Sequence, residues 1–190
     1  MLCVISALCL IEAQAYGANN NNHKRYAYVK LNGVAVWQAS WIGEYPTHRG
    51  VNVMVVDPSS CTLQEWHNFD THEDRYAAGL LRDYLQGLYN GTLLVGVSCD
   101  TAEGYLNASL TTLSALGADV SDVGFRGAWV FAAVKGDPSK TVFDKQLTEA
   151  TEANAKQPRI NLTFGNCDHT MHPIFGPSQP GNSVTDFDKI

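Results

Sequence analysis

The sequence lacks an apolar run long enough to cross a membrane as a helix. Residues 2–11 are almost entirely apolar, but this run covers only about half of the roughly 20 residues that a bilayer-spanning helix requires. The chain also lacks a cluster of Lys or Arg, and its 13 basic and 19 acidic residues give a formal net charge of −6. A mildly acidic chain of this kind is a poor partner for nucleic acid or for an anionic membrane. We therefore expect neither nucleic-acid binding nor membrane insertion.

The common signatures of catalysis and metal binding are missing as well. There is no Gly-x-Ser-x-Gly nucleophile motif, no phosphate-binding loop and no protease signature around a cysteine. Two groups of potential metal ligands match no recognised zinc spacing: His67, Asp70, His72 and Asp74, and Cys167, Asp168, His169 and His172. We therefore expect a protein that is not an enzyme and that holds neither a cofactor nor a metal.

The apolar N-terminal run ends in Ala13-Gln14-Ala15, the small-x-small pattern after which signal peptidase cleaves. This pattern predicts a secretory signal peptide over residues 1–15 and a polar lead over residues 16–25. The mature chain would then begin near Tyr16 and be secreted to the extracellular space or the lumen of the secretory pathway. The alternative is an uncleaved anchor.

Cleavage at this point would leave an odd number of cysteines for an oxidising compartment: Cys61, Cys99 and Cys167. One disulfide plus one free or intermolecular thiol accounts for three cysteines, and the spacing does not decide which two pair. A leftover thiol allows a disulfide-linked homodimer, and a non-covalent homodimer is the alternative. Three glycosylation sequons indicate a glycosylated surface: Asn90, Asn107 and Asn161.

The first half of the chain predicts two β-hairpins. Asn32-Gly33 lies between two strand-like runs, at residues 26–31 and 34–39, and both of these residue types tolerate the positive φ of a tight turn. Residues 51–56 are apolar like a buried strand, and a short polar turn separates them from a second strand over residues 63–69. We expect these two strands to pair.

Helices and strands then alternate. A helix is expected from the capping residue Asp70 to about Asn90, and a second from Leu106 to Leu116 with Gly117 as its C-cap. Strands are expected at residues 92–98 and 129–134, the latter apolar throughout and so covered on both faces. This alternation predicts a mixed α/β fold with a partly parallel sheet. Residues 149–190 are polar, which predicts a low-structure tail that contributes little to the core.

Three charged residues lie at the ends of these apolar strands. Arg49 precedes residues 51–56, Asp100 follows residues 92–98, and Arg126 precedes residues 129–134. If the three strand ends meet, the structural interpretation is an ion pair that closes the sheet. The functional interpretation is a polar pocket in which the charged groups bind sugar hydroxyls and a neighbouring aromatic ring covers the sugar. The candidate rings are Phe125, Trp41 and Trp129.

Several motifs in order carry a resemblance to a known family. They are Arg49-Gly50-Val51-Asn52-Val53, Asn68-Phe69-Asp70-Thr71, Gly91-Thr92-Leu93-Leu94, Leu116-Gly117 and Gly124-Phe125-Arg126 followed by Trp129-Val130-Phe131. With these motifs, residues 26–148 resemble the ILEI/PANDER-like domain, also called the GG domain. The resemblance implies a β-sandwich of mixed parallel and antiparallel sheets with two to three helices packed outside. The family includes cytokine-like secreted proteins and the carbohydrate-binding stem domain of protein O-mannose N-acetylglucosaminyltransferase.

The resemblance to the stem domain also implies a site. Its sugar-contacting arginine, aspartate and arginine correspond to Arg49, Asp100 and Arg126, and Phe125 stands where the stem domain has a larger aromatic residue. Gly127 departs from the acidic residue that usually follows the second arginine. The implied function is a secreted, non-catalytic, lectin-like protein whose partner is a glycan or glycoprotein. The alternative is a secreted cytokine-like protein that binds a cell-surface receptor without a sugar site.

Overall fold

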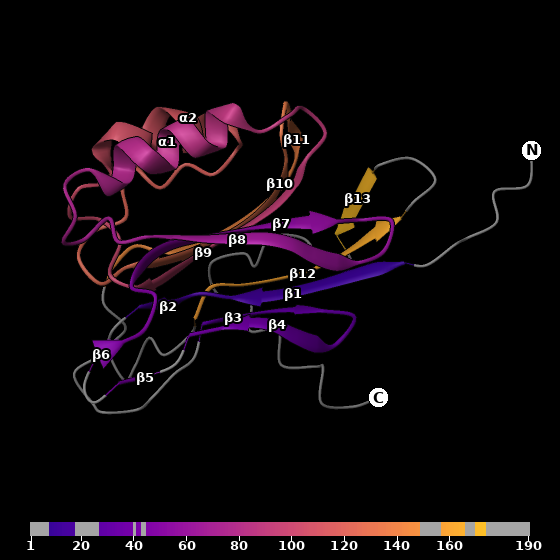
Figure 1. Cartoon of the computed structure of the whole chain (residues 1–190), viewed down its shortest axis with the longest axis horizontal. Coiled ribbons are helices and arrows are strands. Elements are labelled where there is room, and N and C mark those ends of the chain that lie inside the picture. Colours follow the sequence, from indigo (N-terminus) through magenta and orange to yellow (C-terminus); the bar gives the residue numbers. More distant parts are fainter. Residues whose placement is uncertain are drawn as a thin grey trace, which may run out of the picture.

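The protein is built from two packed β-sheets with helices on the outer face of one of them (Figure 1). The computed structural model describes residues 8–17, 27–39, 41–42, 45–148, 157–165 and 170–173. Two short strands, β5 (Trp41–Ile42) and β6 (Tyr45–Pro46), form a separate ribbon beside the two sheets. The expected sandwich with external helices is therefore present.

The N-terminal sheet contains five antiparallel strands in the order β13-β12-β1-β3-β4. Their bounds are β1 (Cys9–Gln14), β3 (Tyr28–Leu31), β4 (Val34–Gln38), β12 (Arg159–Gly165) and β13 (Thr170–Pro173). The predicted hairpin at Asn32-Gly33 is confirmed, because both residues have positive φ, 49° and 79°, and join β3 to β4.

The central sheet has the strand order β11-β10-β9-β7-β8, with β2 (Tyr16–Gly17) paired to the end of β9. Its strands are β7 (Gly50–Asp57), β8 (Thr62–Phe69), β9 (Leu93–Asp100), β10 (Ala128–Val134) and β11 (Asp137–Gln146). The predicted β7–β8 hairpin is confirmed. The expectation of a partly parallel sheet is not supported: β7, β9 and β10 pair antiparallel, and the parallel pairing is confined to the two residues of β2.

Two short helices cover the outer face of the central sheet. They are α1 (Ala77–Gly87) and α2 (Leu110–Ala115), the latter preceded by the 3₁₀ turn η1 (Leu106–Ser109). The predicted helix start at Asp70 is wrong, because Asp70 caps a separate turn in which the Asp74 amide donates to the Asp70 carbonyl, and α1 begins only at Ala77. No helix in the described part of the chain is long and apolar enough to span a membrane.

The central sheet is buried on both faces, so the molecule has two hydrophobic cores. One core lies between the sheets and includes Ile11, Met54 and Phe164. The other lies beneath the helices and includes Leu81 and Trp129. Strand β10 contributes alternate residues to both cores, and all seven of its residues are buried. This confirms the prediction that residues 129–134 form a strand covered on both faces.

The segment that we predicted to be a cleaved leader contributes a central strand. β1 lies between β12 and β3, and its residues Cys9, Ile11 and Ala13 are fully buried in the core between the sheets. Cleavage after Ala15 stays a prediction, and it would remove this strand from the middle of its sheet. The leader role and the strand role are therefore mutually exclusive for residues 9–14.

The prediction of a low-structure tail over residues 149–190 is wrong for two segments. β12 pairs with β1 along six residues, and its Ile160, Leu162 and Phe164 are at most 2% exposed. β13 extends the same sheet. The polar composition of the region conceals an alternating strand, because only every second residue of β12 faces the core. The folded unit thus extends beyond residues 26–148 in both directions.

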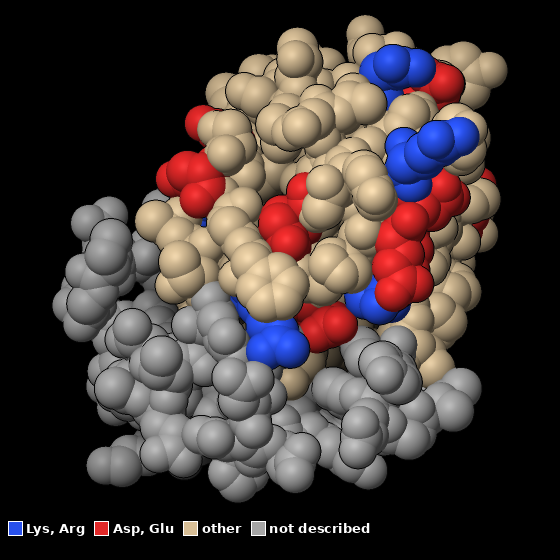
Figure 2. Space-filling model, turned by 90° about the vertical axis from the view of Figure 1, so that its left-hand side faces the viewer, with Lys and Arg blue, Asp and Glu red and all other residues tan. Residues whose placement is uncertain are grey.

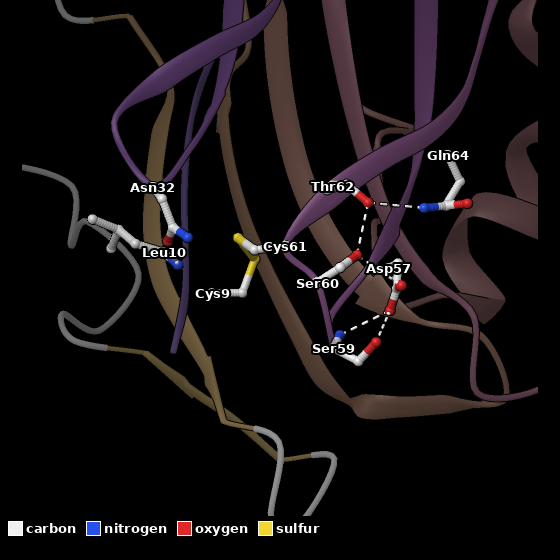
Figure 3. The surroundings of a disulfide bond; sticks show 9 residues. All are labelled: Cys9, Leu10, Asn32, Asp57, Ser59, Ser60, Cys61, Thr62 and Gln64. Carbon is white, nitrogen blue, oxygen red and sulfur yellow. Dashed lines mark hydrogen bonds between the residues drawn. A yellow bond between two sulfur atoms is a disulfide. The ribbon is translucent and has the colours of Figure 1, made fainter. Parts of the chain in front are cut away.

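A disulfide joins Cys9 of β1 to Cys61 in the turn between β7 and β8, and so links the two sheets (Figure 3). Cys61 is thus a disulfide cysteine as predicted, but its partner was not among the three candidates. Cys99 is a buried free thiol. Burial, with a smaller contribution from the charge of Asp100, raises the pKa of the Cys99 thiol to about 12. Cys99 forms no disulfide in this structure, and its burial makes it inaccessible for an intermolecular one. The third candidate, Cys167, lies outside the described residues.

The three predicted glycosylation asparagines lie in different environments. Asn90 and Asn107 are exposed, after α1 and in η1 respectively. Asn161 is half-buried on β12, opposite Glu12 of β1. A glycan is compatible with folded structure at the two exposed positions, and their modification stays a prediction.

Candidate functional site

Arg49, Asp100 and Arg126 come from strand ends at the same edge of the central sheet. β7 begins opposite the end of β9, since Gly50 pairs with Cys99. β10 also begins beside the end of β9, since Val130 pairs with Val97 two residues after the start of β10. Antiparallel pairing thus brings the start of β7, the end of β9 and the start of β10 together. The convergence that the sequence left open is present, and we call this group of residues the Arg-Asp-Arg site.

Arg49 is held by two carboxylates from the turn that follows β8. Its Nη2 atom lies 2.8 Å from Asp70 Oδ2 and 2.7 Å from Glu73 Oε2, and its Nε donates to Asp70 Oδ1 at 3.3 Å. The hydrogen bonds that Arg49 donates to Asp70 are the main cause that raises the pKa of Arg49, against the opposing effect of burial. The Arg49 guanidinium is therefore fixed, with most of its hydrogen-bonding capacity already used.

Asp100 is the acidic centre of the site. It ends β9 with a φ of 64°, in the left-handed region that aspartate tolerates better than most residues. Burial raises the pKa of its carboxyl, and the charges of Arg126, Arg49 and His72 counteract only part of this effect. Ionising this partly desolvated carboxyl therefore costs free energy even though two arginines lie nearby. Residues with pKa values perturbed in this way are frequent at functional sites.

Arg126 and Phe125 form the exposed side of the site. Arg126 also has a positive φ, 56°, and its guanidinium carbon lies 5.1 Å from the centre of the Phe125 ring. Phe125 is 55% exposed, although it is a large apolar side chain. Asp100 and Arg126 thus both have a positive φ, which is unfavourable for residues other than glycine, and they lie in two loops that meet. The surrounding structure must hold both residues in this conformation.

The structure explains why Gly127 departs from the family pattern. A Cβ atom at this position would lie 2.5 Å from Val123 Cγ1 and 2.8 Å from the carbonyl oxygens of Gln146 and Leu147. No acidic side chain fits there without displacing backbone. The polar surroundings of Arg126 must therefore come from other loops.

Three further residues complete the surroundings of the site, and none of them was predicted from the sequence to lie there: His72, Glu103 and Tyr105. His72 lies with its ring centre 6.3 Å from that of Phe125 and its Nδ1 atom 3.9 Å from Glu103 Oε1. Among the described residues this buried Nδ1 atom has no hydrogen-bond partner. Tyr105, 48% exposed, is positioned by a hydrogen bond from its amide to the Thr71 carbonyl.

The view onto this end of the sheet shows basic and acidic side chains in contact on one face (Figure 2). Blue and red atoms lie side by side near the middle of the face, with uncharged surface above them. The arrangement fits a mixed-charge site with apolar neighbours, and differs from an extended basic or acidic patch.

The other candidate residues lie elsewhere. Trp129 is buried beneath the helices and cannot contact a ligand, and the side chain of Trp41 is not described. His67 lies on β8, away from His72. No group of three or more His, Cys, Asp or Glu side chains in the described ranges is placed to hold a metal ion. Of the second group of potential ligands, residues 167–169 lie outside those ranges.

Comparison with known proteins finds a match for the segment of the chain that contains the Arg-Asp-Arg site. The model of the family described as interleukin-like EMT inducer matches residues 49–137. This segment is therefore similar to the interleukin-like EMT inducer family. The matched segment includes Arg49, Asp100 and Arg126 together with α1 and α2, whereas β1 and β12 lie outside it.

Curated proteins are also similar to about half of this chain. The chain is 34% identical to the human cell migration-inducing and hyaluronan-binding protein over 99 residues, which are 51% of this chain and 7% of that protein. It is 31% identical to mouse protein FAM3D over 108 residues, 56% of this chain and 48% of that protein. The chain thus spans less than half the length of either relative.

Proposed function

We propose that this protein is an extracellular, non-catalytic carbohydrate-binding protein whose ligand occupies the Arg-Asp-Arg site. The observation that carries the proposal is the convergence of Arg49, Asp100 and Arg126 at one sheet edge beside the exposed Phe125 ring. Guanidinium and carboxylate groups bind sugar hydroxyls in fixed directions, and an exposed ring covers the apolar face of a pyranose.

The chemistry of the site favours binding over reaction. The positive charges of Arg126 and Arg49 act on the Asp100 carboxyl and favour its ionised form. The Arg49 guanidinium already pairs with the carboxylates of Asp70 and Glu73. No nucleophile is paired with a base among the side chains that we describe at this site. The charged groups therefore serve as hydrogen-bonding partners for a ligand.

The disulfide and the relatives support an extracellular setting. Disulfides persist in oxidising compartments, and Cys9–Cys61 joins the two sheets of the core. One relative is named as a hyaluronan-binding protein, so at least one protein that contains a region similar to this chain binds a glycan, although the name does not assign that binding to the similar region. A glycan or glycoprotein is accordingly the partner that we propose.

A receptor-binding, cytokine-like role is the second candidate. The description of the family as interleukin-like favours it. So does an exposed apolar strip on and before α1, where Tyr76 is 63% exposed and Leu80, four residues later, is 58% exposed. Side chains at this spacing lie on one face of a helix, as in a protein-binding surface.

A glycan-array screen of the purified protein tests the first candidate. We expect binding that disappears in Arg126→Ala and persists in Arg82→Ala, a control that removes an exposed arginine on α1. Loss of a charged hydrogen-bonding group costs about 1.5–3 kcal/mol, a factor of roughly ten to a hundred in affinity. Absence of binding by the wild-type protein across a broad array would reject the proposal and leave the receptor-binding role.

A further inference from the structure

We propose that the Arg-Asp-Arg site selects uncharged sugars and rejects sugars that carry a carboxylate. This inference rests on the proposed function and specifies the ligand class. It follows from the balance of charges around the site, which has two arginines, Arg49 and Arg126, and a larger number of carboxylates: Asp70, Glu73, Asp100 and Glu103. The two arginines and the four carboxylates alone sum to a formal charge of −2.

Arg49 is not available to compensate a charged ligand. Its guanidinium already contacts one carboxylate at 2.8 Å and another at 2.7 Å, and its side chain is only 18% exposed. A ligand carboxylate would have to replace Asp70 or Glu73, and the displaced group would remain nearby as an additional negative charge. A neutral hydroxyl avoids this exchange, because it can accept a hydrogen bond without adding charge.

Asp100 and Glu103 act against a ligand carboxylate from the other side. An ionised Asp100 carboxylate only accepts hydrogen bonds, so it matches a sugar hydroxyl, which donates. A ligand carboxylate at neutral pH has no proton to donate and is repelled. Glu103 adds to this repulsion, because its charge acts on Asp100 and its Oε1 atom lies 3.9 Å from His72, next to the exposed Phe125.

The remaining positive group, Arg126, does not reverse the balance. It faces the Phe125 ring at 5.1 Å and contributes one charge against those of Asp100 and Glu103. Pairing a carboxylate with Arg126 would thus be offset by two like-charge contacts. The preference should be strongest at low ionic strength, because partly exposed charges are screened by salt.

The test compares an uncharged oligosaccharide with one that carries carboxylates. Chitotetraose consists of N-acetylglucosamine, and a hyaluronan tetrasaccharide alternates this same sugar with glucuronate, which carries a carboxylate. We would titrate each into the full chain by calorimetry at about 20 mM and about 150 mM salt. The expected result is binding of chitotetraose at least about tenfold tighter at low salt, about 1.4 kcal/mol, with a smaller ratio at high salt.

Charge-neutralising variants identify the groups responsible. Glu103→Gln keeps the shape and an acceptor for Thr101, so the affinity for the hyaluronan tetrasaccharide should rise about three- to fivefold relative to that for chitotetraose. Asp83→Asn, an exposed carboxylate on α1 that pairs with Arg82, is the matched control and should change neither affinity.

The outcomes distinguish this inference from the proposed function. Equal or tighter binding of the hyaluronan tetrasaccharide by the wild type would overturn the selectivity and leave the carbohydrate-binding role intact. An unchanged affinity ratio in Glu103→Gln would also overturn it as argued here. Binding of neither oligosaccharide, together with a negative glycan array, would reject the proposed function and the selectivity with it.

Discussion

Asp100 is the residue on which the candidate site most depends. Its burial raises its pKa, so the folded protein is less stable when this carboxyl is ionised. A group of this kind contributes stability below its unfolded pKa, and that contribution is lost as the pH rises through its higher folded pKa. The same residue is the acidic centre of the proposed sugar site, so stability and binding should respond in opposite directions to its removal.

We predict that Asp100→Asn does not lower, and at neutral pH raises, the thermal unfolding temperature while it abolishes sugar binding. Asparagine tolerates the left-handed backbone at this position, so the variant removes the charge without straining the chain. Thermal melts between pH 3 and pH 8 would check this. The difference from wild type should be largest near pH 7 and vanish below about pH 4, where the carboxyl is protonated in both the folded and the unfolded state. A large loss of stability at pH 7 would instead show that Asp100 is a structural ion-pair partner.

Arg49 should stabilise the folded protein at neutral pH, in contrast to Asp100, because it pairs with Asp70. Burial opposes the ionised form of Asp70, but the hydrogen bonds from Arg49 and from the Glu73 and His72 amides outweigh it and lower the pKa of Asp70. Asp70 therefore contributes stability above its unfolded pKa of about 4, and this contribution is lost as the pH falls through its folded value.

We accordingly predict that Arg49→Ala costs about 1–3 kcal/mol of folding stability at pH 7, since it leaves a half-buried carboxylate without its main partner. The cost should shrink as the pH falls below about 4. Denaturant titrations at pH 7 and pH 3 measure it. Equal costs at both pH values would contradict the assignment of Asp70 as the group that stabilises Arg49.

Residue-level prediction from the sequence succeeded where position along a strand was sufficient. Arg49, Asp100 and Arg126 were identifiable because each lies at the end of an apolar strand. Their mutual distance depends on strand direction, which comes from pairing between distant segments. Glu103 was missed, and His72 was considered only as a potential metal ligand, because only the contact between two separate loops places them at this site.

At the scale of elements, two strands were hidden by patterns that have a second meaning. Ile11, Ala13 and Ala15 alternate with polar residues, as in a strand with one buried face. Ala13 and Ala15 are also the two small residues of the signal-peptidase pattern. β12 alternates in the same way within a polar region. Local composition favoured a leader and a tail, and only the long-range pairing of β1 with β12 reveals that each is the partner of the other.

Truncation after Glu149 is predicted to prevent stable folding. It would remove β12 and β13, expose one side of β1 and delete Ile160, Leu162 and Phe164 from the core between the sheets. Loss of a single large core side chain costs about 2–5 kcal/mol, so loss of three is comparable to the whole stability of a typical domain. Soluble yield and thermal unfolding of the truncated chain check this. A folded product with an unchanged melting temperature would contradict the structural role of β12.

The strand role of β1 predicts that secreted protein retains Cys9, whereas the leader role predicts that it does not. β1 is central to its sheet and holds one half of the disulfide, so a chain that begins at Tyr16 would lose both. N-terminal sequencing of the mature protein decides between the two roles of this segment. A first residue at Tyr16 in folded, soluble material would support the leader and require another partner for Cys61.

At the scale of the whole molecule, the disulfide joins the two sheets. It closes a loop of 52 residues, for which the chain-entropy estimate of stabilisation is about 4 kcal/mol. Cys61→Ser should therefore lower stability by an amount of this order. Under native conditions Cys99 should resist alkylation, because it is buried and its thiol is protonated at neutral pH. Rapid labelling of Cys99 in the folded protein would contradict the packing of the two sheets.

The three-layer arrangement also explains where the site lies. Both faces of the central sheet are covered, one by the second sheet and one by helices, so its strand ends are the places where loops can gather around a ligand. The loops after β8 and β9 are held to each other by a hydrogen bond from Thr71 Oγ1 to the Ala102 carbonyl at 2.6 Å. The site is therefore built on a rigid frame and should change little on binding.

Calorimetric titration of wild-type and Asp100→Asn protein with chitotetraose, with thermal melts of the same samples, tests the central claim most directly. We predict measurable binding by the wild type and none by the variant, with the variant at least as stable as the wild type at pH 7. Binding that survives in Asp100→Asn, or a variant that loses binding only because it no longer folds, would contradict the claim that Arg49, Asp100 and Arg126 form a carbohydrate site.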